Sequence, residues 1–383
     1  MADGALAIEQ RVTDALHGGP PSVLWLRETF AWMGGHSGYD QLCTRLETKV
    51  SSHDSVWKGQ RSLPRGTSRA LARAGRGLRA GPSHSRESLV LELEAAWRIR
   101  RRAPQVVHAL YAEESLGYLI PRSRRPRTAL VATAHQPAGW WRAHHRNADA
   151  LAALDAMIVP ARREVEYFEE WLPGRVTFVP HGVDTEFFLP LDAPSREVAD
   201  RNAPRVVFSG MWLRDLPTLV AVVERVLRVD RHVQIDLIVP RARRHDPEYI
   251  GLLSEDRVHW HGPLSDNELR SVYAAGAVLL LPVHDSTANN ALLEAMSCAL
   301  PIVSNRVGGV LDYTTAAFAE LFELRDVESM AEAVLRLIND REERHSRGLA
   351  ARAHAVAHLG WDGVAEKTLA VYEAAARRHA GAQ

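Results

Sequence analysis

Short apolar runs alternate with helix-forming segments along most of this chain, and the alternation starts again in its second half. Each run has the length of one buried β-strand, and strands that alternate with helices predict parallel sheets covered by helices. The five runs of the first half are 22–26, 105–110, 128–134, 156–160 and 176–180, and the five of the second half are 205–210, 233–239, 258–262, 277–283 and 301–305. We therefore expect an α/β protein built from two similar blocks.

A proline-bearing stretch, 189–204, separates the two blocks and is typical of a linker. A chain of 383 residues is long enough for two domains of ordinary size. We expect a first domain over 1–188, a second over 189–360, and a terminal helix over 361–383 that completes the first. Because open α/β sheets bind ligands at the carboxyl ends of their strands, the sequence predicts a ligand cleft between the domains.

The composition excludes several classes of protein. Apolar residues make up 46% and charged residues 25%, as in a folded soluble protein, and no apolar run approaches the roughly 20 residues that cross a bilayer. Cys43 and Cys298 are too few for a disulfide framework or a structural zinc site. A formal net charge of zero argues against nucleic acid as a partner. We expect a cytoplasmic protein, since the first residues do not resemble a secretion signal.

Arginines are concentrated between residues 61 and 102, a stretch that contains eleven arginines and only three acidic residues. Such a stretch can contact an anionic membrane surface or an anionic acceptor. The alternative is a solvated, arginine-rich connection that has no partner, and the sequence leaves both open.

The block 287–309 carries the most chemical information. Thr287, Asn289 and Asn290 come just before a run of strong helix formers, and a helix start offers free N–H groups that suit a pyrophosphate. Glu294 follows one turn later, where its carboxylate can accept hydrogen bonds from ribose hydroxyls. The alternative is an ordinary capped helix with an exposed glutamate.

Residues 292–303, LLEAMSCALPIV, resemble the C-terminal half of the signature of family 4 glycosyltransferases. The resemblance implies the GT-B fold: two Rossmann-like domains face each other across a cleft, and the C-terminal helix crosses back to the first. It also implies that Glu294 holds the donor ribose. Ser286 stands where the family usually has a second glutamate on the donor sugar, which leaves the donor's identity open. The segment His181 to Asp184 resembles the family's hinge between the domains.

The same resemblance extends to other donor-binding positions. Gly210 ends a predicted strand, Met211 replaces an arginine usual in the family, and Arg214 lies near the family's diphosphate-binding lysine. Arginine can bind phosphate through two donors, although Arg214 could instead pair with Asp215 or another surface acid. The remaining positions that the resemblance assigns to the donor are Gly34, Gly35, His261 and Leu264.

Four residues of the first half are candidates for the transferred sugar and the acceptor. His135 follows the predicted strand 128–134, at the position where the family's histidine touches the transferred sugar, although a lone histidine is more often structural. We assign His36 to the acceptor side. Trp140 and Trp141 can stack on a sugar or an apolar acceptor, although simple packing is the more common use of such residues.

The resemblance implies a retaining enzyme that moves a hexose from a UDP- or GDP-type sugar to a hydroxyl of a metabolite, lipid or glycan. We expect catalysis by His135, Arg214 and Glu294 without a metal or another cofactor, because no acidic D-x-D cluster is present. We expect a monomer or homodimer. The alternatives are a nucleotide-sugar epimerase on the same fold and an inactive nucleotide-sugar-binding relative, the latter suggested by Ser286 and Met211.

Overall fold

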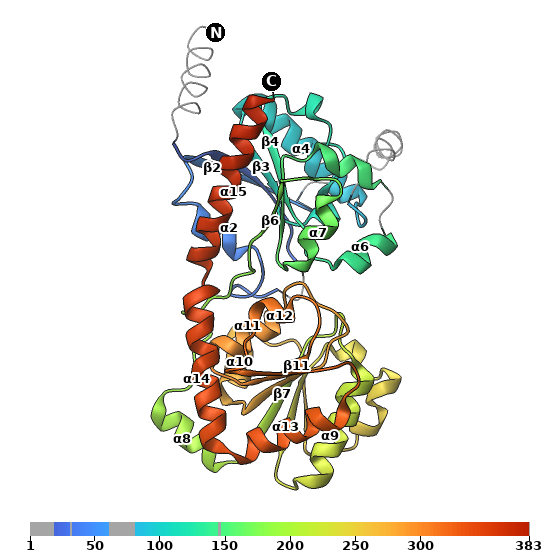
Figure 1. Cartoon of the computed structure of the whole chain (residues 1–383), viewed down its shortest axis with the longest axis vertical. Helices are drawn as coiled ribbons and strands as arrows, with labels where there is room; N and C mark the ends of the chain where they lie inside the picture. Colours follow the sequence, from blue (N-terminus) through green and yellow to red (C-terminus); the bar gives the residue numbers. More distant parts are fainter. Residues whose placement is uncertain (1–18, 31–32, 61–80, 145–146, 383) are drawn as a thin grey trace. The chain divides into compact units, whose positions relative to one another are not determined.

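The computed structural model describes residues 19–30, 33–60, 81–144 and 147–382. The chain forms two compact units, which Figure 1 traces in sequence colours. Unit 1 comprises 1–30, 39–179 and 364–383, and unit 2 comprises 31–38 and 180–363. Unit 2 thus begins earlier than the expected 189, because Val183 N donates to Leu359 O at 2.8 Å and Phe188 is buried in the core of unit 2. The glycine-rich loop 33–38 also belongs to unit 2.

Unit 1 contains a parallel sheet of six strands in the order β2-β1-β3-β4-β5-β6. The strands are β1 (Ser22–Arg27), β2 (Ser52–Trp57), β3 (Val106–Ala109), β4 (Ala129–Thr133), β5 (Ala156–Val159) and β6 (Val176–Phe178). Within the described residues, its α-helices are α2 (Gln41–Leu46), α4 (Arg86–Arg102), α5 (Ala112–Ser115), α6 (Ala138–His144), α7 (Arg163–Glu169) and most of α15 (Trp361–Gly381). Five strands match the predicted runs. The sixth, β2, was missed because this edge strand is half-polar and only Val56 in it is buried.

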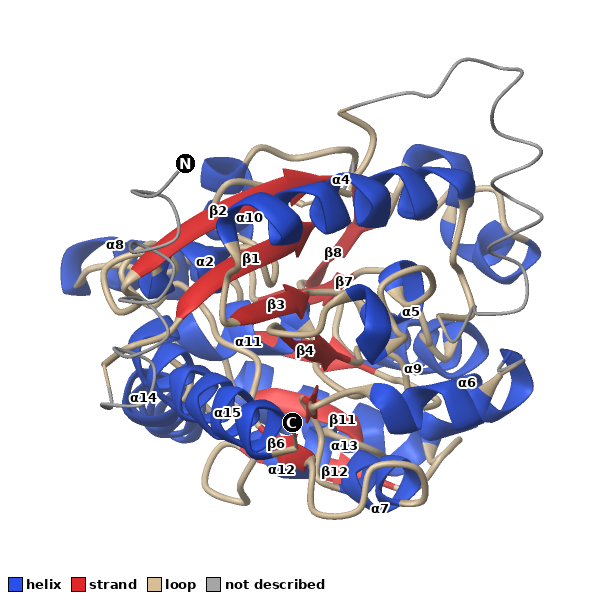
Figure 2. Cartoon of the chain, turned by 90° about the horizontal axis from the view of Figure 1, so that it is seen from above, coloured by secondary structure: helices blue, strands red, loops and turns tan. Residues whose placement is uncertain are grey.

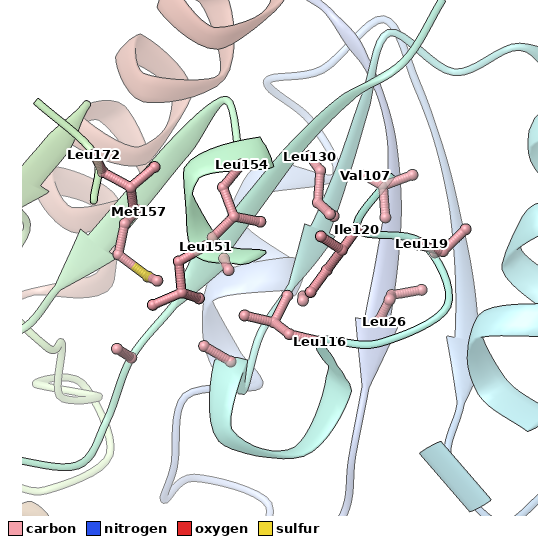
Figure 3. Close-up of a cluster of buried hydrophobic side chains, with 14 of the residues drawn as sticks. Leu26, Val107, Leu116, Leu119, Ile120, Leu130, Leu151, Leu154, Met157 and Leu172 are labelled. Carbon is pink, nitrogen blue, oxygen red and sulfur yellow. The ribbon is translucent and has the colours of Figure 1, made fainter. Parts of the chain in front are cut away.

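Successive side chains along the strands of the unit 1 sheet point to opposite faces of the sheet, and each face is packed against helices or connecting segments. Leu26, Val107 and Leu130 pack with leucines of the connecting segments in the cluster that Figure 3 shows. Their neighbour Trp25 points to the opposite face, as alternation along a strand requires, and donates from Nε1 to the hydroxyl of Tyr372 on α15 at 3.2 Å. Helices therefore cover both faces of this sheet, as Figure 2 shows in blue around the red strands. The predicted terminal helix is confirmed.

Unit 2 contains a second parallel sheet of six strands, in the order β12-β11-β10-β7-β8-β9. The strands are β7 (Arg205–Ser209), β8 (Gln234–Ile238), β9 (Val258–His261), β10 (Val278–Leu281), β11 (Ile302–Asn305) and β12 (Ala319–Phe322). Its α-helices are α8 (Ala193–Arg201), α9 (Leu216–Val229), α10 (Asp266–Ala275), α11 (Asn290–Ser297), α12 (Val310–Tyr313), α13 (Val327–Asn339) and α14 (Arg341–His358). The sequence missed β12, another short edge strand.

The expected linker 189–204 contains a helix, α8, so its assignment as a plain linker was wrong. Asp192 caps this helix by accepting from Ser195 N at 2.9 Å, and Pro194 lies in the first turn. A proline is tolerated there because the N–H that it lacks would have no partner within the helix. Proline therefore marks a helix start here instead of a break.

The first part of the arginine-rich stretch, 61–80, lies outside the described residues, and so does most of the predicted membrane contact. The rest forms α4, where Arg98 binds Asp54 and Glu94 and Arg102 binds Asp54. These pairs offset part of the local positive charge. Within the described ranges, no helix combines the length and the hydropathy that a bilayer crossing needs.

Candidate functional site

The start of α11 lies after β10, at the carboxyl end of the unit 2 sheet. Asn289 occupies the N-cap position with an extended backbone, but its side chain does not cap the helix. Its Oδ1 instead accepts a hydrogen bond from Nη2 of Arg214 at 3.1 Å. Thr287 and Asn289 are buried, and Asn290 begins the helix. The helix start thus places N–H groups next to a guanidinium, which together favour an anion.

Arg214 is held by oxygen atoms that carry no charge. Besides Asn289, it donates to Ser209 O and Trp212 O, both at 2.9 Å. The alternative pairing with Asp215 is wrong, because Asp215 caps α9 by accepting from Thr218. Burial lowers the pKa of Arg214 to about 10, so the guanidinium stays charged at neutral pH. In the described part of the chain no carboxylate pairs with this charge, and it is available to an anionic ligand.

Gly210 makes room for this arginine. Its φ of +93° lies in the left-handed region, and an added Cβ would come within 2.5 Å of Nη2 of Arg214. Glycine is therefore required both by the backbone conformation and by the close approach of the guanidinium.

Glu294 is 5% exposed, so the alternative of an exposed glutamate is wrong. Its Oε1 accepts a hydrogen bond from the hydroxyl of Ser37 at 2.6 Å. Burial raises the pKa of Glu294 to about 7, and the hydrogen bond from Ser37 together with the nearby hydroxyl of Tyr273 limits this rise. The group is a buried carboxylate that already binds one hydroxyl.

The glycine-rich loop 33–38 is fixed to unit 2 by two further carboxylates. His36 N donates to Oδ2 of Asp266 at 3.0 Å, and Nδ1 of His36 lies 2.7 Å from Oδ2 of Asp184. An added Cβ on Gly34 would approach Oδ1 of Asp266 to 1.6 Å, so only glycine permits this contact. Gly34, Gly35 and His36 are thus in the same unit as Glu294. For His36, this differs from the expected place on the acceptor side.

Ser286 is buried in the loop before α11. Gly309 N donates to Ser286 O at 2.6 Å, and Gly308, whose φ is +46°, leaves no room for a Cβ beside the same oxygen. The loop therefore packs directly on the Gly308-Gly309 turn. The carboxylate nearest in sequence is that of Asp285, whose Oδ1 accepts from Ser286 N at 2.8 Å.

The other donor-side candidates of unit 2 lie at the end of β9. Nε2 of His261 lies 2.6 Å from Oδ1 of Asp236, which also binds Arg205, so this imidazole is engaged in the sheet. Leu264 is half-buried just before Ser265, the N-cap of α10. Nothing in their contacts joins them to Glu294 directly.

His135 lies in unit 1, after β4, and is held by a buried carboxylate. Oε1 of Glu113 accepts from His135 N at 2.6 Å and from Gln136 N at 2.7 Å, and burial raises the pKa of Glu113 to about 7. Nε2 of His135 lies 2.9 Å from Leu110 O. Glu113 therefore fixes the backbone that carries His135.

The two tryptophans differ. Trp141 is fully buried and packs edge-on against Phe168 in the core of unit 1, so its assignment to the acceptor side was wrong. Trp140 is half-buried and stacks on His144. The sequence could not separate them, because successive residues of a helix lie on different faces and the pattern does not say which face is covered.

Four residues that take part in these contacts were not predicted as site residues. Ser37 and Asp266 had no distinguishing signal, because Ser265 to Glu268 predicts only a capped helix start. Asp184 was expected to belong to a structural hinge. Glu113 lies in a segment with no recognised motif.

The described residues include no group of three or more histidine, cysteine or acidic side chains that could hold a metal ion. The site of unit 2 is built from one guanidinium, one helix start and several carboxylates.

Two family models match successive parts of the chain. Residues 57–187 match the model described as Glycosyltransferase Family 4, and residues 203–340 match the model described as Glycosyl transferases group 1. Together they cover more than half of the chain.

The chain is also similar to characterised proteins over part of their length. It is 31% identical over 211 residues to the MMP alpha-(1->4)-mannosyltransferase of Mycolicibacterium hassiacum. The matched region covers 54% of this chain and 50% of that protein. It is 28% identical over 254 residues to the D-inositol 3-phosphate glycosyltransferase of Xylanimonas cellulosilytica, which covers 60% and 59%. The chain thus spans about half to three-fifths of the length of these relatives.

Solved structures share the fold over nearly the whole chain. Sucrose-phosphate synthase from Thermosynechococcus elongatus has a TM-score of 0.70 at 17% identity and covers 95% of this chain and 100% of its own. The HepE protein of Anabaena in complex with UDP-glucose has a TM-score of 0.61 at 13% identity, with 91% and 98% covered. With the two parallel six-stranded sheets, these likenesses show the GT-B fold that the sequence predicted.

Proposed function

This chain belongs to family 4 of the glycosyltransferases, and on that basis we propose that it moves a hexose from a nucleotide-diphosphate sugar to a hydroxyl of an acceptor. The observation that carries the proposal is the grouping in unit 2 of a buried carboxylate, an uncapped helix start and a charged guanidinium. These three features suit the ribose, the diphosphate and the charge of the leaving group.

Each of these groups has a distinct role in the proposed reaction. Glu294 accepts hydrogen bonds from ribose hydroxyls of the donor. Arg214 and the first N–H groups of α11 stabilise the negative charge that develops on the diphosphate as its bond to the sugar breaks. Such positioned charges can act without a metal ion. The anomeric configuration is retained, with the leaving phosphate taking the proton of the acceptor hydroxyl on the same face of the sugar.

Unit 1 carries the residues that we propose for the transferred sugar and the acceptor. His135, on the backbone that Glu113 holds, contacts the transferred sugar, and the loop beyond it contributes to acceptor binding. The HepE structure contains UDP-glucose and one relative is named a mannosyltransferase, so UDP-glucose and a nucleotide-diphosphate mannose such as GDP-mannose are the donors to test first.

The proposal is tested by the substitution Glu294→Ala. We expect the variant to lose at least tenfold in affinity for UDP or GDP sugars, because each charged hydrogen bond contributes roughly 1.5–3 kcal/mol. Isothermal titration with both nucleotide classes measures the effect. The matched control is Glu332→Ala on α13, where the glutamate is exposed. Unchanged donor binding and turnover in Glu294→Ala would refute the assignment.

Product analysis separates the proposed activity from its alternatives. An epimerase converts the donor when no acceptor is present, whereas a transferase releases the sugar to water or to an acceptor. A binding protein does neither, although it still binds the nucleotide. Chromatography of the donor after incubation with the protein alone distinguishes the three.

A further inference from the structure

His36 is held in one orientation by three contacts, all with unit 2. Its backbone N–H donates to Asp266, its Nδ1 lies 2.7 Å from Oδ2 of Asp184, and its ring stacks on Phe187 with centroids 3.7 Å apart and planes 4° apart. The imidazole nevertheless remains 42% exposed. A side chain that is fixed and yet exposed is prepared to bind something, because its rotamer freedom is already lost.

Asp184 decides which ring nitrogen of His36 can accept a hydrogen bond. A carboxylate oxygen only accepts, so Nδ1 carries the proton and Nε2 of the neutral ring is an acceptor. Oδ1 of the same carboxylate accepts from the N–H groups of Glu186 and Phe187, which fixes its orientation. Among the described residues, none hydrogen-bonds to Nε2 of His36.

The charges around His36 favour a hydroxyl partner over a phosphate. The carboxylates of Asp184 and Asp266 contact His36 directly, and Glu294 binds the adjacent Ser37. The only cation that faces this cluster through a described contact is Arg270, whose guanidinium lies over the ring of Phe187 at 4.9 Å. Three acids against one arginine repel an anion, whereas acceptor groups bind the hydroxyls of a sugar.

The position of His36 next to Ser37 indicates which part of the donor it contacts. Ser37, its neighbour, donates to Glu294, the proposed ribose group, so His36 belongs to the donor side of the site. At position 286, where the resemblance places a carboxylate on the donor sugar, this chain has the neutral hydroxyl of a serine. We propose that His36, oriented by Asp184, is a specificity-determining residue whose Nε2 accepts a hydrogen bond from a hydroxyl of the donor's sugar. This inference rests on the proposed function.

The test compares each nucleotide with and without its sugar. The probes are UDP against UDP-glucose and GDP against GDP-mannose, and titration calorimetry measures both members of a pair. We expect His36→Ala to lower the affinity for the sugar nucleotide about tenfold, as for the loss of one hydrogen bond. The affinity for the plain diphosphate should stay within about twofold of the wild-type value. His232→Ala, which removes an exposed histidine elsewhere in unit 2, is the matched control and should change neither.

Asp184→Asn tests the positioning role without removing volume. The amide oxygen can keep the bonds to Glu186 and Phe187, so the amide NH₂ turns to His36 and makes Nδ1 the acceptor. Nε2 then becomes a donor, and we expect the same loss of the sugar-dependent affinity. In a His36→Ala background, Asp184→Asn should add nothing to that loss, because the two changes act through one ring.

Two outcomes would overturn the inference while leaving the proposed function intact: equal weakening of diphosphate and sugar nucleotide by His36→Ala, or no change in either. If the wild-type chain binds neither pair, the proposed function itself fails. The two failures are therefore distinguishable.

Discussion

The hydroxyl of Ser37 donates a 2.6 Å hydrogen bond to the carboxylate of Glu294, a residue 257 positions further along the chain. The buried carboxylate thus already binds a hydroxyl, which is the same group that a donor ribose would present. A bound nucleotide sugar must either share this carboxylate with Ser37 or displace the Ser37 hydroxyl from it. The five predictions below concern Glu294 itself, the neighbouring Arg214 and Gly210, and the core of unit 1.

The protonation of Glu294 should make donor affinity depend on pH. Its pKa is raised to about 7, mainly by burial, and protonation removes acceptor capacity toward ribose. We expect affinity for UDP or GDP to rise between about pH 6 and about pH 8 in the wild type, beyond any rise in Glu294→Gln. Calorimetric titrations of both proteins across this range measure the difference, and parallel pH profiles would contradict it.

The same pKa shift should appear in the stability of the protein. Because the pKa of Glu294 is raised from 4.5 to about 7, the folded protein holds this proton more tightly, and stability falls as pH rises through that range. Glu294→Gln cannot lose the proton. We therefore expect the variant to gain stability relative to the wild type between pH 5 and pH 8, as measured by urea denaturation.

Arg214→Ala should lower the affinity for nucleotide diphosphates about tenfold, since a charged hydrogen bond to phosphate contributes roughly 1.5–3 kcal/mol to binding. Arg214→Lys should recover only part of this, because a lysine presents one point of charge where arginine presents a planar fork. The matched control is Arg225→Ala on α9, where the arginine is partly exposed and pairs with Glu328. Binding of UDP and GDP is the measurement, and wild-type affinity in Arg214→Ala would mean that another cation holds the diphosphate.

Gly210→Ala should impair nucleotide binding through Arg214. The new Cβ would lie 2.5 Å from Nη2, so the guanidinium has to move, and the left-handed φ adds about 1–2 kcal/mol of strain. Gly59→Ala is the control, because Gly59 has a φ of +83° with nothing within 4 Å of an added Cβ. Both variants should lose stability, but only Gly210→Ala should lose nucleotide affinity. Normal binding in Gly210→Ala would show that the position of Arg214 is not critical.

Tyr372→Phe should destabilise unit 1. The hydroxyl of Tyr372 on α15 lies 2.6 Å from Nδ1 of His108 and accepts from Trp25, and all three side chains are buried. Loss of the hydroxyl leaves buried polar atoms without a partner, which costs about 1–3 kcal/mol. Urea denaturation measures the change. Tyr118→Phe is the control, because the hydroxyl of Tyr118 makes no hydrogen bond within the described ranges, and equal effects of the two variants would contradict the prediction.

The sequence by itself determined the two α/β blocks and the identity of the central strands. Ten apolar runs correspond to ten parallel strands. Eight of them are central strands, which are largely apolar along their length because both of their faces are covered. It also predicted that a helix starts near Asn290, with Glu294 one turn later, since these residues lie close together in the chain and form one local pattern. Two of the four edge strands, β2 and β12, escaped because one face of an edge strand can remain polar and no run of apolar residues forms.

Only the tertiary structure decided what surrounds Glu294. The loop 33–38 follows a strand of unit 1 in the chain, yet it belongs to unit 2 through Asp184, Asp266 and Glu294. The partners of His36 and Ser37 lie 148 to 257 positions away, and no local pattern encodes which acid meets which hydroxyl. For the same reason, the sequence did not reveal that Trp141 is buried in the core of unit 1, or that no carboxylate of the described ranges pairs with Arg214. Periodicity reports which side chains must leave water, whereas their partners depend on how distant segments pack.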